Sequence, residues 1–143
     1  MRRAAIIALA AAGLALAACT SEAAADDAAA APVSEAAPKI ETLDTAALAA
    51  LLEGGSIRLI DVRTDEEVAE GIIPGAEHIA LDRFDPTALD TSDGREVVLY
   101  CRSGRRSGIA AERLAEHTGE TARHLEGGIL EWQDAGLPLS EPD

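Results

Sequence analysis

The sequence predicts an α/β fold with a central, mostly parallel sheet and helices on both faces. Two observations predict it. From residue 39 to residue 143, short β-branched runs alternate with helical patterns, which is typical of strands joined by crossover helices. Within that stretch, residues 97–100 form a nearly unbroken apolar run, as expected for a central strand buried on both faces.

Five strands are expected where short apolar runs lie between turn residues. The third follows the turn formed by Ile73-Pro74-Gly75-Ala76. The predicted strands cover residues 40–43, 57–62, 78–81, 97–100 and 123–125.

Four helices are expected from start and stop signals. Asp44 can cap the first, and Gly54 ends it. Thr64 and Glu67, three residues apart, form a capping-box signature at the start of the second. Glycines follow the third and the fourth. The predicted helices cover residues 44–53, 64–70, 106–117 and 129–135.

The composition indicates one globular domain and excludes several classes of protein. The chain has 143 residues, of which 48% are hydrophobic, and its formal net charge is −14. The apolar fraction is enough for a core, so disorder throughout is excluded. An acidic chain repels phosphates, which excludes nucleic-acid binding through charge. Two cysteines and three scattered histidines lack metal-ligand spacing, so we expect no metal and no other cofactor.

Residues 1–18 are predicted to be an export signal. Arg2 and Arg3 precede an uncharged apolar run that is too short to favour a membrane span. The tetrapeptide Leu16-Ala17-Ala18-Cys19 resembles the lipobox of bacterial lipoprotein signals, which implies that Cys19 is acylated and holds the protein at a membrane. We therefore expect a periplasm-facing lipoprotein of the cell envelope, with the outer membrane favoured over the inner one. The alternative is an ordinary cleaved signal whose cysteine is incidental.

Residues 19–38 are predicted to be a lipid-attached, disordered, Ala-rich linker before a domain at residues 39–143. The linker has no recurring large apolar residue and cannot bury a core, although its alanines allow a transient helix. Removal of residues 1–18 deletes two arginines and no acid, which changes the net charge from −14 to −16.

The loop that begins at Cys101 is the segment most suited to chemistry. It leads from a buried strand to a helix, so backbone N–H groups and the helix N-terminus favour an anion there. Gly104 lets the backbone curl without a side-chain clash. A cysteine beside arginines at a helix N-terminus favours the thiolate form. Cys101 is therefore predicted to be a nucleophile, and the alternative is an inert buried thiol.

Three segments, in order and spacing, resemble the rhodanese-like single-domain sulfurtransferases. Ile72 departs from that family, which usually has histidine before the Ile-Pro-Gly-Ala turn. The three segments are Leu59-Ile60-Asp61-Val62-Arg63 with Gly71-Ile72-Ile73-Pro74-Gly75-Ala76; Cys101-Arg102-Ser103-Gly104-Arg105-Arg106-Ser107; and Leu125-Glu126-Gly127-Gly128-Ile129 with Trp132, Gly136, Pro138 and Leu139.

The resemblance implies a rhodanese-like fold and a persulfide relay. Cys101 would take a sulfane sulfur from a small anionic donor such as thiosulfate and pass it to cyanide or a thiol. The residues agree, because such a transfer needs one exposed thiolate, a cradle for a sulfur anion and no neighbouring thiol. The residues expected to bind the substrate are Arg102, Ser103, Gly104, Arg105, Arg106 and Ser107.

Two other functions stay open. Cysteine-dependent phosphatases and arsenate reductases place an arginine six residues after the cysteine, and here that position is Ser107, so they are less favoured. A non-enzymatic persulfide carrier fits the same loop. Asp61 and Arg63 are expected to form a structural ion pair, and Trp132 is expected to be a core anchor. We expect a monomer.

Overall fold

The computed structural model describes residues 39–142. The predicted export signal, Cys19 and the linker up to residue 38 lie outside the described residues. Among the helices of residues 39–142, none has the length and apolar character needed to cross a membrane.

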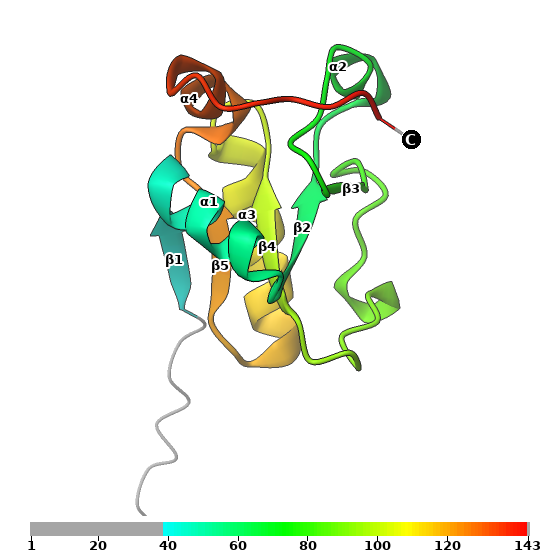
Figure 1. The fold of residues 1–143 in the computed structure, drawn as a ribbon. Helices are drawn as coiled ribbons and strands as arrows, with labels where there is room; N and C mark the ends of the chain where they lie inside the picture. The colour runs from blue at the N-terminus through cyan, green and yellow to red at the C-terminus, as the bar shows by residue number, and fades with distance from the viewer. Residues whose placement is uncertain (1–38, 143) are drawn as a thin grey trace, which may run out of the picture. The chain divides into compact units, whose positions relative to one another are not determined.

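The five strands form one sheet in the order β1-β5-β4-β2-β3, and every neighbouring pair is parallel. The predicted parallel sheet and its central strand, β4, are confirmed (Figure 1). The strands are β1 (Ile40–Leu43), β2 (Ile57–Asp61), β3 (Glu77–His78), β4 (Glu96–Tyr100) and β5 (Ala122–Leu125).

Strand β3 is shorter than predicted and begins one residue earlier. Beyond it, Ile79 N–H donates to the Asp61 carbonyl and Leu81 N–H donates to the Val62 carbonyl, at 2.9 and 3.2 Å. Arg83 N–H then bonds back to Ala80, so the chain turns and the ladder stops. Residues 79–81 of the predicted strand therefore run beside β2, to which they are hydrogen-bonded, but they are not part of a regular strand.

The four predicted helices are present, and a short 3₁₀ helix, η2 (Pro86–Ala88), was not predicted. Helix α2 has the predicted capping box of Thr64 and Glu67. It is one turn long, because the N–H groups of Glu70 and Gly71 donate to carbonyls only three residues earlier. The helices are α1 (Thr45–Gly54), α2 (Asp65–Val68), α3 (Arg105–Thr118) and α4 (Gly128–Asp134).

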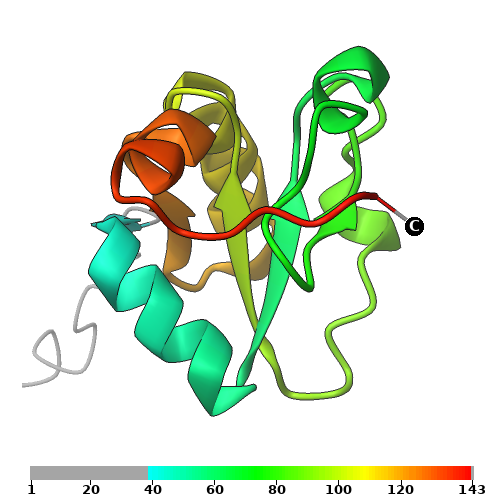
Figure 2. The same cartoon turned by 45° about the horizontal axis from the view of Figure 1, so that its top comes forward.

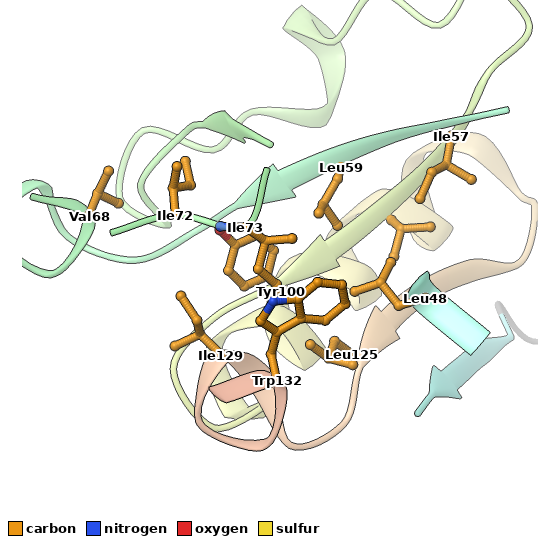
Figure 3. Close-up of a cluster of buried hydrophobic side chains, with 11 residues drawn as sticks. Leu48, Ile57, Leu59, Val68, Ile72, Ile73, Tyr100, Leu125, Ile129 and Trp132 are labelled. Atoms are coloured by element: carbon orange, nitrogen blue, oxygen red, sulfur yellow. The ribbon is translucent and has the colours of Figure 1, made fainter. Parts of the chain in front are cut away.

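Apolar side chains pack on both faces of the sheet. On one face, Leu48 of α1 and Trp132 of α4 pack against strand residues such as Leu59 (Figure 3). On the other face, Ala110 and Ala111 of α3 pack against β2 and β4. The prediction of helices on both faces is confirmed.

The C-terminal segment crosses the carboxyl ends of the strands (Figure 2). Ile72 and Ser140 exchange two backbone hydrogen bonds of 2.9 Å, in an isolated antiparallel bridge. Trp132 is the predicted core anchor, and its Nε1–H donates to the Pro138 carbonyl at 2.9 Å. Ile72, where the family usually has histidine, is buried in the same cluster, so the departure supplies core packing.

Candidate functional site

The candidate site lies where β4, the central strand, ends. Cys101 follows β4 directly, and α3 begins four residues later at Arg105. Helix α3 has Gly104 at its N-cap position, and no side chain caps it. The first N–H groups of a helix have no intrahelical partner. An anion held in this loop can therefore receive backbone hydrogen bonds.

Two glycines let the loop pack closely against the chain around α4. Gly104 has φ 86°, and a Cβ at this position would overlap the carbonyl oxygen of Glu126. Gly128 has φ 63°, and its Cβ would lie 2.5 Å from the carbonyl oxygens of Cys101 and Arg102. A side chain at either position would force the backbone of the loop to move.

Backbone hydrogen bonds join the loop to the first turn of α4. Ile129 N–H donates to the Cys101 carbonyl at 2.8 Å, and Leu130 N–H donates to the Arg102 carbonyl at 3.2 Å. These bonds occupy the carbonyl oxygens of Cys101 and Arg102. Backbone contacts with α4 thus help to position the loop.

Arg106 is held beside the loop by Glu67 of α2. Its two terminal nitrogens donate to the two carboxylate oxygens of Glu67, at 2.6 and 2.7 Å. The hydrogen-bonded guanidinium is the main cause that lowers the pKa of Glu67 to about 2. The same bond raises the pKa of Arg106, and the nearby Cys101 sulfur adds to that rise. Arg106 is therefore a fixed cation next to the thiol.

The other two arginines of the loop are free. Arg102 and Arg105 are exposed, as is Ser103. Within residues 39–142, neither arginine forms an ion pair. Both guanidinium groups can therefore turn toward an approaching anion, although the loop does not fix them.

The Ser107 side chain stabilises the loop by a hydrogen bond. Its hydroxyl donates to the Gly104 carbonyl at 3.0 Å and lies 3.2 Å from Nδ1 of His124. Both side chains are buried, and burial lowers the pKa of His124. The hydroxyl expected to bind the substrate is thus engaged within the protein.

Cys101 is 1% exposed, so the exposed thiolate expected from the sequence is not seen. Its side chain belongs to the apolar cluster on the α3 face, with Val62, Leu99 and Ala110. The reason is that β4 is the central strand and the loop folds over its end.

Asp61 and Arg63 form a buried ion pair at the end of β2, with Nη2 of Arg63 2.6 Å from the carboxylate. Arg63 also donates to the carbonyls of Glu67 and Gly71. Its guanidinium carbon lies 5.9 Å from the centre of the Tyr100 ring. The pair thus joins β2 to α2 beside the loop, which is a structural role.

Two depressions adjoin the loop. A small one of about 100 Å³ lies between Arg102, Glu67 and Leu130. A larger groove of about 650 Å³ runs between α2 and α3, with Val62 and Arg106 in its lining. In residues 39–142, no three His, Cys, Asp or Glu side chains are grouped as metal ligands would be.

Comparison with known proteins identifies the family. The rhodanese-like domain model matches residues 44–135. A putative sulfurtransferase of Bacillus subtilis, YtwF, is 41% identical over 102 residues, which cover 70% of this chain and 97% of the relative. The human thiosulfate:glutathione sulfurtransferase is 35% identical over 106 residues, which cover 64% and 91%. This chain belongs to the rhodanese-like domain family.

Solved structures show the same fold. A Rhodopseudomonas palustris protein of unknown function, described as a possible tyrosine phosphatase, aligns with TM-score 0.63 and 31% identity. The alignment covers 71% of this chain and 85% of that one. One Synechocystis relative is longer, since the match spans 54% of its length.

The sequence predicted the loop but not the residues that support it. The capping-box signature accounts for Glu67, and nothing in the sequence pairs it with Arg106, 39 positions away. No spacing in the sequence indicates that His124 lies beside Ser107. Gly128 lay within the family-like segment, yet its close contact with the Cys101 and Arg102 carbonyls depends on the tertiary fold.

Proposed function

We propose that this chain is a sulfurtransferase in which Cys101 carries a sulfane sulfur as a persulfide. The donor is a small sulfur anion such as thiosulfate, and the acceptor is cyanide or a thiol. The observation that carries this proposal is the position of Cys101, directly after the central strand and before the uncapped N-terminus of α3. Family membership and the sulfurtransferase relatives support a sulfur-transfer role in general.

The first step loads the cysteine. The Cys101 thiolate attacks the outer sulfur of thiosulfate, the S–S bond of thiosulfate breaks, and sulfite leaves with the electron pair. In the second step the acceptor attacks the outer sulfur of the persulfide. The new S–S bond breaks, and Cys101 returns to the thiolate. No oxidant or reductant is consumed from outside.

The charges around the loop suit these steps. Arg106 is fixed beside the thiol by Glu67, and Arg102 and Arg105 are free to meet the donor. The uncapped N–H groups at the start of α3 are oriented to hold a terminal sulfur anion. Cys101 is the only cysteine among residues 39–142, so no second thiol there can discharge the persulfide.

Phosphate chemistry has less support. A phosphatase of this fold type needs a guanidinium six residues after the cysteine to hold phosphoryl oxygens. That position holds Ser107, which is buried and bonded to the Gly104 carbonyl. Arg106, one position earlier, is already paired with Glu67.

The test is the Cys101-dependent formation of thiocyanate from thiosulfate and cyanide. We expect repeated turnover by the native chain and none by Cys101→Ser, which keeps the size of the side chain. Equal rates for the two proteins would exclude the proposal. A single turnover that loads Cys101 with sulfur, detected by mass spectrometry, and then stops would favour a persulfide carrier. Faster release of phosphate from an aryl phosphate would favour the phosphatase.

We further propose that the protein is a lipoprotein of the cell envelope, anchored through acylated Cys19. The support is the lipobox-like tetrapeptide at residues 16–19. Mass spectrometry of the N-terminal peptide from the native source should find acyl groups on Cys19, and Cys19→Ser should leave the membrane fraction. A precursor cleaved elsewhere and free of lipid would contradict this.

A further inference from the structure

We propose that the surface around the Cys101 loop docks a partner protein, whose cysteine exchanges sulfur with the persulfide. The docking surface, the loop rim, consists of Arg102, Arg105, Ile109 and Leu130. The partner segment that fits it has carboxylate and apolar side chains next to its cysteine. This inference rests on the proposed function, because it assigns the kind of partner that the same site serves.

The two apolar members of the loop rim are exposed on the two helices that adjoin the loop. Leu130 of α4 is 41% exposed and Ile109 of α3 is 37% exposed. Among residues 39–142, the other large apolar side chain that is exposed to this extent is Ile40 of β1, at 38%. Cyanide and thiosulfate gain little from apolar side chains, whereas burial of apolar surface drives most protein association. The position of Ile109 and Leu130 therefore favours a polypeptide as the partner.

The members of the loop rim are neighbours. Leu130 N–H donates to the Arg102 carbonyl at 3.2 Å, which joins the first turn of α4 to the loop. Arg105 begins α3, and Ile109, four residues later, lies one turn further along the same side of the helix. Both helices start at the carboxyl end of the sheet (Figure 2). A segment laid over the loop can therefore contact apolar and cationic side chains together.

The cations of the loop rim are available for a carboxylate. Among the arginines of residues 39–142, Arg102, Arg105 and Arg113 form no ion pair with another described residue, and two of these three belong to the loop rim. An arginine can hold a carboxylate through two parallel N–H bonds, and arginine is enriched at protein interfaces. The arginines that are paired are Arg58, Arg63, Arg83, Arg95, Arg106 and Arg123.

Exposed acidic residues limit how acidic the partner can be. Glu112 lies one turn after Ile109 on α3, and Glu131 directly follows Leu130. Glu126 is exposed as well, and its carbonyl packs against the glycine of the loop. A partner with a broad acidic surface would be repelled by these carboxylates, whose fields reach ~8 Å at physiological salt. The segment that fits therefore has one or two carboxylates beside its cysteine, opposite the two arginines of the loop rim.

Transfer to such a partner balances without a further reagent. The partner's cysteine loses its proton to solvent, and its thiolate attacks the outer sulfur of the Cys101 persulfide. A new S–S bond forms on the partner, the S–S bond to Cys101 breaks, and the electron pair of that bond stays on the Cys101 sulfur. The products are the partner's persulfide and the Cys101 thiolate.

The test uses two synthetic peptides as acceptors, with thiosulfate as the donor. Each peptide has one central cysteine, which leucines and aspartates flank in the first peptide and serines and asparagines flank in the second. The rate of each peptide with free cysteine persulfide corrects for the different reactivity of the two thiols. We expect the corrected kcat/KM of the native chain to be at least about fivefold higher for the first peptide, as for an interface with apolar and arginine contacts. Equal values overturn the inference, and this comparison needs no variant.

Three matched variants locate the surface. Ile109→Ser and Leu130→Ser should each lower the ratio of the two peptides by about twofold to fivefold, because an apolar contact is lost. Both should keep the native turnover of thiosulfate and cyanide, which does not use these side chains. Ile40→Ser, similar in exposure but at the amino end of β1, should change neither quantity.

Two outcomes with the variants contradict the inference. A native ratio in both Ile109→Ser and Leu130→Ser shows that the loop rim does not bind the peptide. A fall in Ile40→Ser as large as in those two shows that the effect does not come from the loop rim. Failure of the proposed function looks different, because the native chain would then show no Cys101-dependent formation of thiocyanate.

Discussion

The two ends of the parallel sheet contain similar turns but differ in how closely these turns pack. At the carboxyl end of the strands, Gly104 and Gly128 have positive φ, and a Cβ at either would run into backbone atoms. At the amino end, Gly94 and Gly119 also have positive φ, yet a Cβ there would meet nothing within 4 Å. Gly104 and Gly128 thus mark interlocked backbones at the carboxyl end, whereas Gly94 and Gly119 mark isolated turns at the amino end.

Charge differs between the two ends as well. The amino end has its own groove of about 520 Å³, and its arginine, Arg95, is paired with Asp93 at 2.7 Å. At the carboxyl end, Arg102 and Arg105 are without ion pairs among residues 39–142, and a thiol lies beneath them. Groove size alone does not distinguish the two ends. Close packing, free cations and a cysteine together do.

The largest effect is expected from Gly128→Ala. The positive φ costs an alanine about 1–2 kcal/mol, and overlap with the Cys101 and Arg102 carbonyls adds about 1–3 kcal/mol. We expect a loss of about 3 kcal/mol in the free energy of unfolding, measured by urea denaturation. Sulfur transfer by the folded fraction should also be lost, because the loop over Cys101 has to move. A variant with native activity and stability would show that the carboxyl end is not interlocked.

A smaller loss is expected from Tyr100→Phe. The Tyr100 hydroxyl accepts a hydrogen bond from Ile73 N–H at 3.1 Å, in the buried cluster of Figure 3. Burial and the Asp61 carboxylate raise the pKa of Tyr100, so the hydroxyl stays protonated. Its removal leaves a buried N–H without a partner, which costs about 1–3 kcal/mol. Urea denaturation measures this, and a change below about 0.5 kcal/mol would show that another group replaces the hydroxyl.

These contacts explain what the sequence could and could not predict. Strand β4 and the start of α3 were predictable because an apolar run and a following glycine are local signals. A short loop between strand and helix then follows, and with it the place of Cys101, although α3 begins at Arg105, one residue before the predicted start. The burial of Cys101 was not predictable, since it depends on neighbours such as Val62 and Ala110 that come from other elements.

Long-range pairing explains the remaining differences. The sequence assigned Glu67 to a capping box, and the structure confirms it, but the same carboxylate also binds Arg106. The capping box accounts for Glu67 locally, and no local pattern indicates the second partner, Arg106. Strand β3 was predicted too long because its length depends on how far the chain follows β2.

Gly119→Ala tests the open turn at the amino end. Gly119 follows α3 with φ 71°, and its N–H donates to the Ala115 carbonyl. Alanine there meets no clash, so only the backbone conformation is penalised, and we expect a loss of about 1 kcal/mol. Sulfur transfer should stay at the native level. Asparagine tolerates this conformation better, so Gly119→Asn should lose less. A loss as large as that of Gly128→Ala would remove the contrast between the two ends.

The smallest effect concerns the ion pairs at the two ends, whose contributions to the free energy of unfolding should differ in pH dependence. The pKa of Glu67 in the folded chain is about 2, below the ordinary value of 4.5, chiefly because of the Arg106 guanidinium. The stabilisation is therefore fully present above about pH 4.5 and is lost as the pH falls through 2. Glu67→Gln should lose about 1 kcal/mol near neutral pH, since both side chains are partly exposed and solvent screens the pair.

That loss should shrink below about pH 4.5, because Glu67 of the unfolded chain then binds a proton while the folded carboxylate, with its pKa of about 2, stays ionised. Glutamine keeps the capping box, so the change in pH dependence reports on the ion pair alone. Asp93→Asn is the matched variant at the amino end. There, Arg95 lowers the pKa of the exposed Asp93 carboxylate, chiefly through a hydrogen bond from its backbone N–H. Asparagine can still accept that bond, so a smaller loss is expected. Urea denaturation from pH 7 to pH 3 measures both variants. A pH-independent loss in Glu67→Gln would mean that Glu67 acts as a cap and not as the partner that holds Arg106 beside Cys101.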